Sequence, residues 1–153
     1  MSALIVETPK NPAFEADIRS HLDTSPVLRF FGFVFDSVDP GAVTLSANLR
    51  PELGHRSGYF QGAIMGAIAD YSGSFSNMTL QAPAWICLTL DYTIKFLAPA
   101  EGERLIARGR TISAGRTVCV AKSDIFVVRS GGEILCATAL ITTRHAPAQA
   151  EAR

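Results

Sequence analysis

One acidic residue, Asp70, stands inside an apolar segment that runs from position 62 to position 80. An ionised carboxylate is costly to bury without partners, so Asp70 must be paired, exposed in a cleft or protonated. A carboxylate in a partly apolar cleft is what a general base or a nucleophile requires. A partly exposed aspartate on the open face of a helix is the alternative, and the residues alone leave both interpretations open.

Two further features of this segment could take part in the same chemistry. Ser74 follows Asp70 by four positions, so on a helix its hydroxyl shares the face of the carboxylate and could hold a water molecule beside it. At the start of the segment, Gln61-Gly62 combines a side-chain amide with the unpaired N–H groups and positive dipole of a helix end, which suits a developing oxyanion. A packing serine and an ordinary loop glutamine are the alternatives.

The spacing of these residues makes a sharper prediction. Asp70 lies nine positions after Gln61, which corresponds to about 13.5 Å of helix rise and half a rotation. The two side chains therefore cannot meet around one small group within a single chain. If both serve one site, two antiparallel helices must approach across a two-fold axis, and activity requires a dimer.

The elements that must position these residues follow from periodicity and turn signals. Short helices are expected before Ser25-Pro26 and before Gly32, and the segment from 62 to 80 is expected to be one long, enclosed helix. The turns between the later strands are too short for parallel crossovers, so the fold class is α+β with an antiparallel sheet of five to six strands wrapped around a central helix. The expected helices are 13–22, 27–31 and 62–80, the expected strands are 33–38, 42–49, 86–96, 104–112, 117–128 and 134–144, and 50–61 is expected to be a polar loop.

Composition narrows the class of protein. The chain of 153 residues is expected to form a single domain with a core over about 13–145 and frayed termini. Fourteen basic residues offset fourteen acidic ones, so nothing suggests a nucleic acid or membrane partner. Charged residues make up only 18% of the chain, which favours self-association. The three cysteines show no spacing typical of a disulfide framework, and no signal peptide or membrane segment is recognised. Both observations favour a cytoplasmic protein.

These residues resemble the hotdog-fold acyl-CoA thioesterases of the PaaI-like (phenylacetic acid pathway) branch, over about positions 13–145. The family pattern G-x-x-H-G-G, followed by a helix with L-A-D, corresponds to GYFQGA at 58–63 and AIAD at 67–70. Further matches are LTLDYTIKFLAPA at 88–100, Gly102, Gly115-Arg116 and ATALIT at 137–142. The resemblance implies a hotdog fold in dimers, often paired into tetramers, with the site between subunits.

The resemblance also implies roles for individual residues. Asp70 would be the general base or nucleophile, and the Gly62 N–H would polarise the thioester carbonyl. Thr89 aligns with a Ser or Thr that helps to place the attacking water, and Ser74 with a hydroxyl used in a sister branch. Arg116 could grip a phosphate of coenzyme A, with a solvated hairpin arginine as the alternative.

The departures from the family pattern concern the loop before the central helix. Gln61 replaces the family histidine and Ala63 the second glycine, while His55 occupies the place of a common asparagine. Glutamine can still donate a hydrogen bond to a carbonyl, but it cannot exchange protons near neutral pH. His55 could supply that function or simply be solvated, and Tyr59 and Phe60 could line the acyl channel or pack under the loop.

The sequence therefore predicts hydrolysis of an acyl-CoA thioester to a free acid and CoA, without a metal or any cofactor beyond the CoA of the substrate. A non-catalytic acyl-CoA binding or sensing protein is the second hypothesis: Gln61 favours it, whereas the retained Asp70 disfavours it. A hotdog dehydratase or hydratase comes last, because the histidine that such enzymes use is missing. Aromatic, medium-chain and branched acyl groups all remain open.

Overall fold

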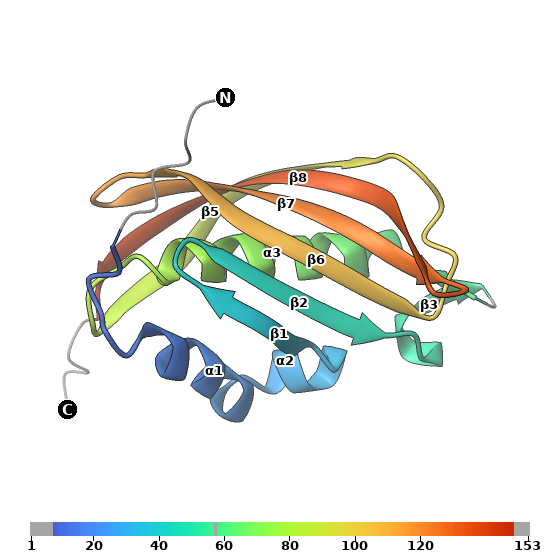
Figure 1. Cartoon of the computed structure of the whole chain (residues 1–153), viewed down its shortest axis with the longest axis horizontal. Helices are drawn as coiled ribbons and strands as arrows, with labels where there is room; N and C mark the ends of the chain where they lie inside the picture. Colours follow the sequence, from blue (N-terminus) through green and yellow to red (C-terminus); the bar gives the residue numbers. More distant parts are fainter. Residues whose placement is uncertain (1–7, 57, 149–153) are drawn as a thin grey trace.

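The computed structural model describes residues 8–56 and 58–148. Six antiparallel strands form one sheet in the order β1-β2-β6-β7-β8-β5, which leaves β1 and β5 at its edges. The sheet curves over one long helix, α3, and the helices α1 and α2 lie on the β1 side (Figure 1). The strands are β1 (Val34–Asp39), β2 (Ala42–Asn48), β5 (Trp85–Phe96), β6 (Arg104–Ala114), β7 (Val118–Arg129) and β8 (Gly132–Pro147); the helices are α1 (Phe14–Thr24), α2 (Pro26–Phe31) and α3 (Gly62–Met78).

This is the α+β hotdog arrangement that the sequence predicts. The helix breaks fall where expected: α1 ends at Ser25, and Gly32 ends α2 in the left-handed conformation with φ 66°. The termini expected to fray lie mostly outside the described residues. The described parts of both termini are ordered by contacts: the Asn11 side chain donates a hydrogen bond to Asp17, and β8 continues as far as Pro147.

Residues 50–61 differ from the expected polar loop. They contain a short 3-10 helix, η1 (Pro51–Leu53), and two small strands, β3 (Gly54–Arg56) and β4 (Tyr59–Phe60), which pair with each other. Leu53 and Phe60 are buried, and the Phe60 N–H donates to the Ala100 carbonyl. These two buried side chains anchor the polar stretch to the core. Its strands have only two or three residues, which is too short for an alternating pattern to be recognised in the sequence.

The α3 helix packs closely against the concave face of the sheet because small residues lie at the contact. A Cβ atom at Gly73 would lie 2.7 Å from Ile141 Cδ1 of β8, and one at Gly109 of β6 would overlap the Ser72 carbonyl. On its other side α3 is not enclosed as expected. Ala63 is exposed, and Ala67, Asp70 and Ser74 are half-buried, so a narrow stripe of small residues stays uncovered.

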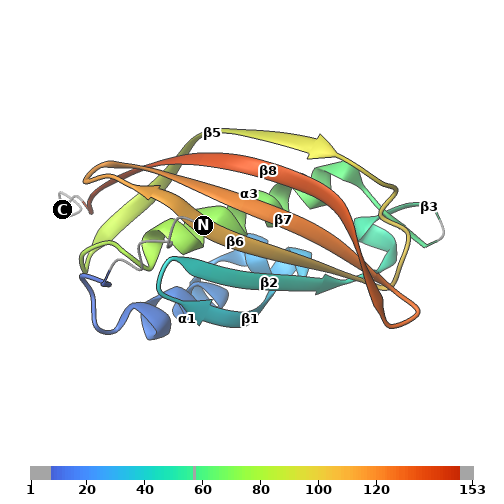
Figure 2. The same ribbon diagram turned by 45° about the horizontal axis from the view of Figure 1, so that its top comes forward.

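The edge strand β5 runs beside this uncovered stripe and has no neighbour on its outer edge among the described residues. Figure 2 shows β5 at the top of the sheet, next to β8. Five of its large apolar side chains are 41–54% exposed: Ile86, Leu88, Leu90, Tyr92 and Phe96. An exposed, apolar strand edge of this length is a surface that soluble proteins usually cover.

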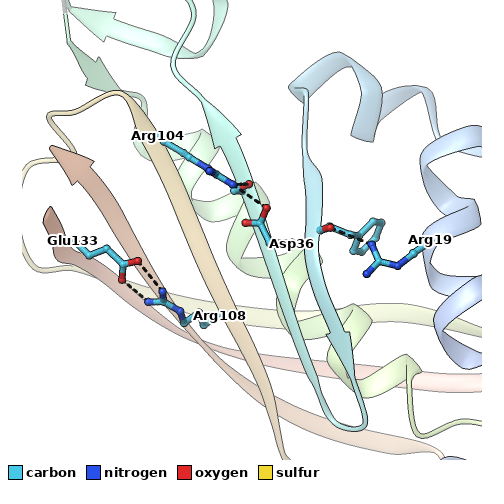
Figure 3. A network of polar contacts seen from close by, with 7 residues as sticks. Arg19, Asp36, Arg104, Arg108 and Glu133 are labelled. Carbon is cyan, nitrogen blue, oxygen red and sulfur yellow. Dashed lines mark hydrogen bonds and ion pairs between the residues drawn. The ribbon is translucent and has the colours of Figure 1, made fainter. Parts of the chain in front are cut away.

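Ion pairs link strands in the opposite part of the sheet, and a hydrogen bond links that part to α1 (Figure 3). Arg104 of β6 donates to Asp36 of β1 at 2.8 Å, and the Arg108 fork donates two hydrogen bonds to Glu133. This paired hydrogen bond lowers the pKa of the Glu133 carboxyl. Arg19 of α1 donates to the Phe35 carbonyl at 3.1 Å and thereby attaches α1 to β1.

Candidate active site

The Asp70 carboxylate is held by two hydroxyl groups. Its Oδ1 accepts hydrogen bonds from Thr89 Oγ1 at 2.8 Å and from Ser74 Oγ at 3.2 Å, and the two hydroxyl oxygens are 3.3 Å apart. Oδ2 has no hydrogen-bond partner within the described part of the chain. One oxygen of the carboxylate is therefore fixed in place while the other remains able to accept a proton or attack an electrophile.

A β-bulge in β5 brings Thr89 to this position. In the second half of the strand, Phe96 and Tyr92 point toward α3 and lie over Gly62 and Gly66. Between Thr89 and Asp91 the register with β8 shifts by one residue. The bulge changes which positions face inward, so that Thr89 reaches Asp70. Without it, the alternation from Phe96 would turn Thr89 to the outer face.

Asp70 lines a hollow of about 540 Å³ between α1, α3 and the start of β5, called here the Asp70 hollow. Burial raises the pKa of the Cys87 thiol in its wall to about 12, so that this group stays protonated near neutral pH. Burial, and secondly the Asp70 charge, raises the pKa of the Tyr71 phenol. The other lining residues are Phe14, Asp17, Ile18, Ser20, His21, Ser74, Phe75, Met78, Ala82, Ala84, Trp85, Ile86 and Thr89.

Sequence reasoning did not assign α1 to the site, although five residues of α1 line this hollow. The signal was weak, because α1 is a short amphipathic helix of ordinary composition far from the motif residues. The packing of Ile18 and His21 against the aromatic cluster of α3 decides its place.

The predicted binding residues of the loop meet in a second hollow, of about 640 Å³, called here the Gly62 hollow. It is lined by His55, Tyr59, Phe60, Gly62, Met65, Phe96, Leu97, Ala98, Pro99 and Ala100. Gly62 is the first residue of α3, and its N–H has no acceptor among the described residues. The Gln61 side chain makes no capping bond, although the Gln61 carbonyl accepts from the N–H groups of Ile64 and Met65.

The two hollows share no lining residue. A single chain thus keeps Asp70 and the Gly62 N–H in separate places, as the helix spacing predicts. Arg116 lines neither hollow: it is exposed in the turn between β6 and β7, at the opposite end of the sheet from β3 (Figure 2). Its role toward a phosphate stays a prediction.

No helix among the described residues is long and apolar enough to cross a membrane. No group of three or more His, Cys, Asp and Glu side chains among them could hold a metal ion.

No protein-family model matches the chain. A protein of Sulfurisphaera tokodaii named "Putative esterase" is 33% identical over 75 residues, which are 49% of this chain and 55% of that protein. The match thus spans little more than half the length of that relative.

Solved structures match far more of the chain. A thioesterase family protein from Silicibacter pomeroyi has a TM-score of 0.85 at 27% identity, covering 88% of this chain and 98% of the other. A phenylacetic acid degradation-related protein from Ralstonia eutropha has a TM-score of 0.72 at 26% identity, covering 86% and 98%. A thioesterase from Haemophilus influenzae, at 18% identity and a TM-score of 0.76, shares the fold, covering 88% and 92%. The resemblance to hotdog thioesterases of the PaaI-like type is confirmed.

Proposed function

From the hotdog fold that this chain shares with thioesterase-family proteins, we propose that it hydrolyses acyl-CoA thioesters to a free carboxylic acid and CoA. One observation carries the proposal: Asp70 has Oδ1 fixed by Ser74 and Thr89, and the residue lines a hollow that has both polar and apolar side chains in its wall. A carboxylate that two hydroxyls orient, beside space for an acyl group, is suited to activate water.

In the proposed reaction, Asp70 Oδ2 accepts a proton from a water molecule as the water oxygen attacks the thioester carbon. The carbonyl oxygen becomes an oxyanion, which the Gly62 N–H stabilises together with the Gln61 amide. The tetrahedral intermediate then expels the CoA thiolate, which takes up the proton from Asp70. Acid and CoA thiol leave, and the chain needs no cofactor of its own for these steps.

The reaction requires a second copy of the chain, because Asp70 and Gly62 lie in separate hollows. In an antiparallel pair of α3 helices that joins Asp70 of one subunit to Gly62 of the partner subunit, each helix crosses the two-fold axis near Gly66. The small residues of the uncovered stripe, Ala63 and Ala67, allow such helices to approach closely. The apolar outer edge of β5 lies beside this stripe and would be covered by the same contact.

Thiol release from a panel of aryl, short, medium and long acyl-CoAs tests the proposal. The wild type should cleave at least one class, and Asp70→Asn should abolish turnover without changing the sedimentation coefficient. Asp91→Asn is the matched control, since Asp91 is an exposed carboxylate on the same strand, paired with Thr142 on the other side of the bulge. Equal turnover by wild type and Asp70→Asn would contradict the mechanism.

Subunit mixing tests the shared site. Asp70→Asn is expected to be inactive and Gly62→Pro to lose at least about a hundredfold in activity, but a heterodimer contains one intact site with wild-type Asp70 from one chain and wild-type Gly62 from the other. Random 1:1 reassociation should restore about a quarter of the wild-type sites. No recovery from verified heterodimers would show that the two residues do not serve a site between subunits.

Binding without catalysis is the second candidate, favoured by Gln61 in the place of the family histidine. The same panel separates the two functions. A binding protein would show no thiol release with any acyl-CoA, while acyl-CoA would still raise its melting temperature.

A further inference from the structure

His21 of α1 lies in the wall of the Asp70 hollow with one ring nitrogen already engaged. Its Nδ1 is 3.0 Å from the Asp17 carbonyl oxygen and 3.2 Å from the Ile18 carbonyl oxygen. Carbonyl oxygens only accept hydrogen bonds, so Nδ1 must carry the proton. In the neutral ring Nε2 is then a hydrogen-bond acceptor, and the tautomer is set by the helix itself.

The Nε2 acceptor is available to a ligand. It has no hydrogen-bond partner in the described part of the chain, and it is not among the buried unpaired atoms, so it is open to solvent. The ring is held in place by an edge-to-face contact with Phe75, at 5.2 Å between centroids. A fixed acceptor in a hollow that also exposes apolar side chains such as Phe14 and Trp85 is a typical specificity group of a small-molecule site.

The place of His21 sets how far this acceptor lies from the reacting bond. Phe75, which the imidazole contacts, follows Asp70 by five positions on α3, which is about 7.5 Å of helix rise. A group bonded to Nε2 would therefore lie several carbon atoms away from a thioester held beside Asp70. The carboxylates of Asp17 and Asp70 both line the hollow and disfavour an acyl group that ends in a second carboxylate.

We propose that the Asp70 hollow takes the acyl group of the substrate, and that His21 Nε2 accepts a hydrogen bond from a hydroxyl group on its distal part. The preferred substrates are then acyl-CoAs that carry a neutral hydroxyl about six heavy atoms from the thioester carbon. This inference rests on the proposed function, since it names the substrate class of the same site. His21 acts in it as a specificity residue that touches the substrate.

A matched pair of substrates, 6-hydroxyhexanoyl-CoA and hexanoyl-CoA, isolates the hydroxyl. One net hydrogen bond corresponds to about a five- to tenfold preference in kcat/KM, and we expect the difference in KM rather than in kcat. His21→Phe keeps a ring against Phe75 but removes Nε2, and should erase the preference while hexanoyl-CoA is still cleaved. Thr24→Ala is the control, because this hydroxyl also belongs to α1, donates to the Ser20 carbonyl at 3.3 Å and does not line the hollow.

Binding to the Asp70→Asn variant, measured by titration calorimetry with the same two ligands, separates the two proposals. A five- to tenfold tighter binding of the hydroxyacyl ligand that disappears in Asp70→Asn/His21→Phe supports the role of His21, even if the wild type releases no thiol. Equal binding of the two ligands overturns it, even if hexanoyl-CoA is hydrolysed. A preference that survives His21→Phe also overturns it, because the hydroxyl is then recognised elsewhere.

Discussion

The buried side chain of His145 should make the protein less stable in mild acid, and its surroundings set the size of the fall in the free energy of unfolding. The side chain is 1% exposed on β8, and its Nε2 lies 2.8 Å from Thr143 Oγ1. Its Nδ1 is buried without a hydrogen-bond partner in the described structure. Burial, and secondly the charge of Lys10, lowers the pKa of His145 from 6.5 to about 4.

The sign follows from the proton balance. Between pH 6.5 and pH 4 the unfolded chain binds a proton at this imidazole and the folded chain does not, so the free energy of unfolding falls as the pH falls. The difference between the pKa of His145 in the unfolded chain, 6.5, and in the folded chain, about 4, corresponds to a total of about 3 kcal/mol in the free energy of unfolding. Between pH 7.5 and pH 5 the linkage relation yields about 2 kcal/mol, which shifts the melting temperature by several degrees for a chain of this size.

Urea unfolding of the wild type and of His145→Gln at pH 7.5 and pH 5, at one protein concentration, measures this effect. The other titrating groups are common to both proteins, so the difference between their pH dependences isolates His145. His145→Leu provides a second variant without a titrating group, in case the glutamine is poorly accommodated. If wild type and variants lose the same free energy between the two pH values, the imidazole is not held neutral in the folded protein.

Three further predictions concern the site. Gly62→Pro removes the N–H at the first helical position, which accepts proline, so kcat should fall about 10²- to 10³-fold. Gly62→Ala keeps the N–H and should stay active, and an equal loss of kcat in both variants would refute the oxyanion role. Thr89→Val removes the 2.8 Å bond to Asp70 and should lower kcat about ten- to a hundredfold, whereas Thr93→Val on the outer face should not; equal rates would refute the positioning of Asp70. In Gly66→Ala the new Cβ lies 3.2 Å from the Tyr92 hydroxyl, and this crowding offsets the gain of about 1 kcal/mol in helix propensity. Urea unfolding should therefore show the gain only when Tyr92→Phe is also present, and the same gain in both backgrounds would show that the hydroxyl does not crowd the Cβ.

Local signals decided much of this protein. Alternating strands, the short turns between the later strands and the breaks at Ser25-Pro26 and Gly32 predicted nearly all the elements, because periodicity and turn chemistry act within a few residues. The spacing of Asp70 and Ser74 placed two oxygens on one helix face, and the structure joins them by a hydrogen bond. The separation of Asp70 from Gly62 followed from helix geometry alone.

Contacts between distant segments decided the rest. The bulge at Leu90 that turns Thr89 toward Asp70 depends on how β5 pairs with β8, and no local pattern marks it. Three further features arise only when the sheet closes over the helix: the position of β5 at the edge of the sheet, the uncovered stripe of α3 and the wall that α1 adds to the Asp70 hollow. The sequence determines which chemical groups are present, but packing sets the distances between groups that are far apart in the chain. The site depends on those distances.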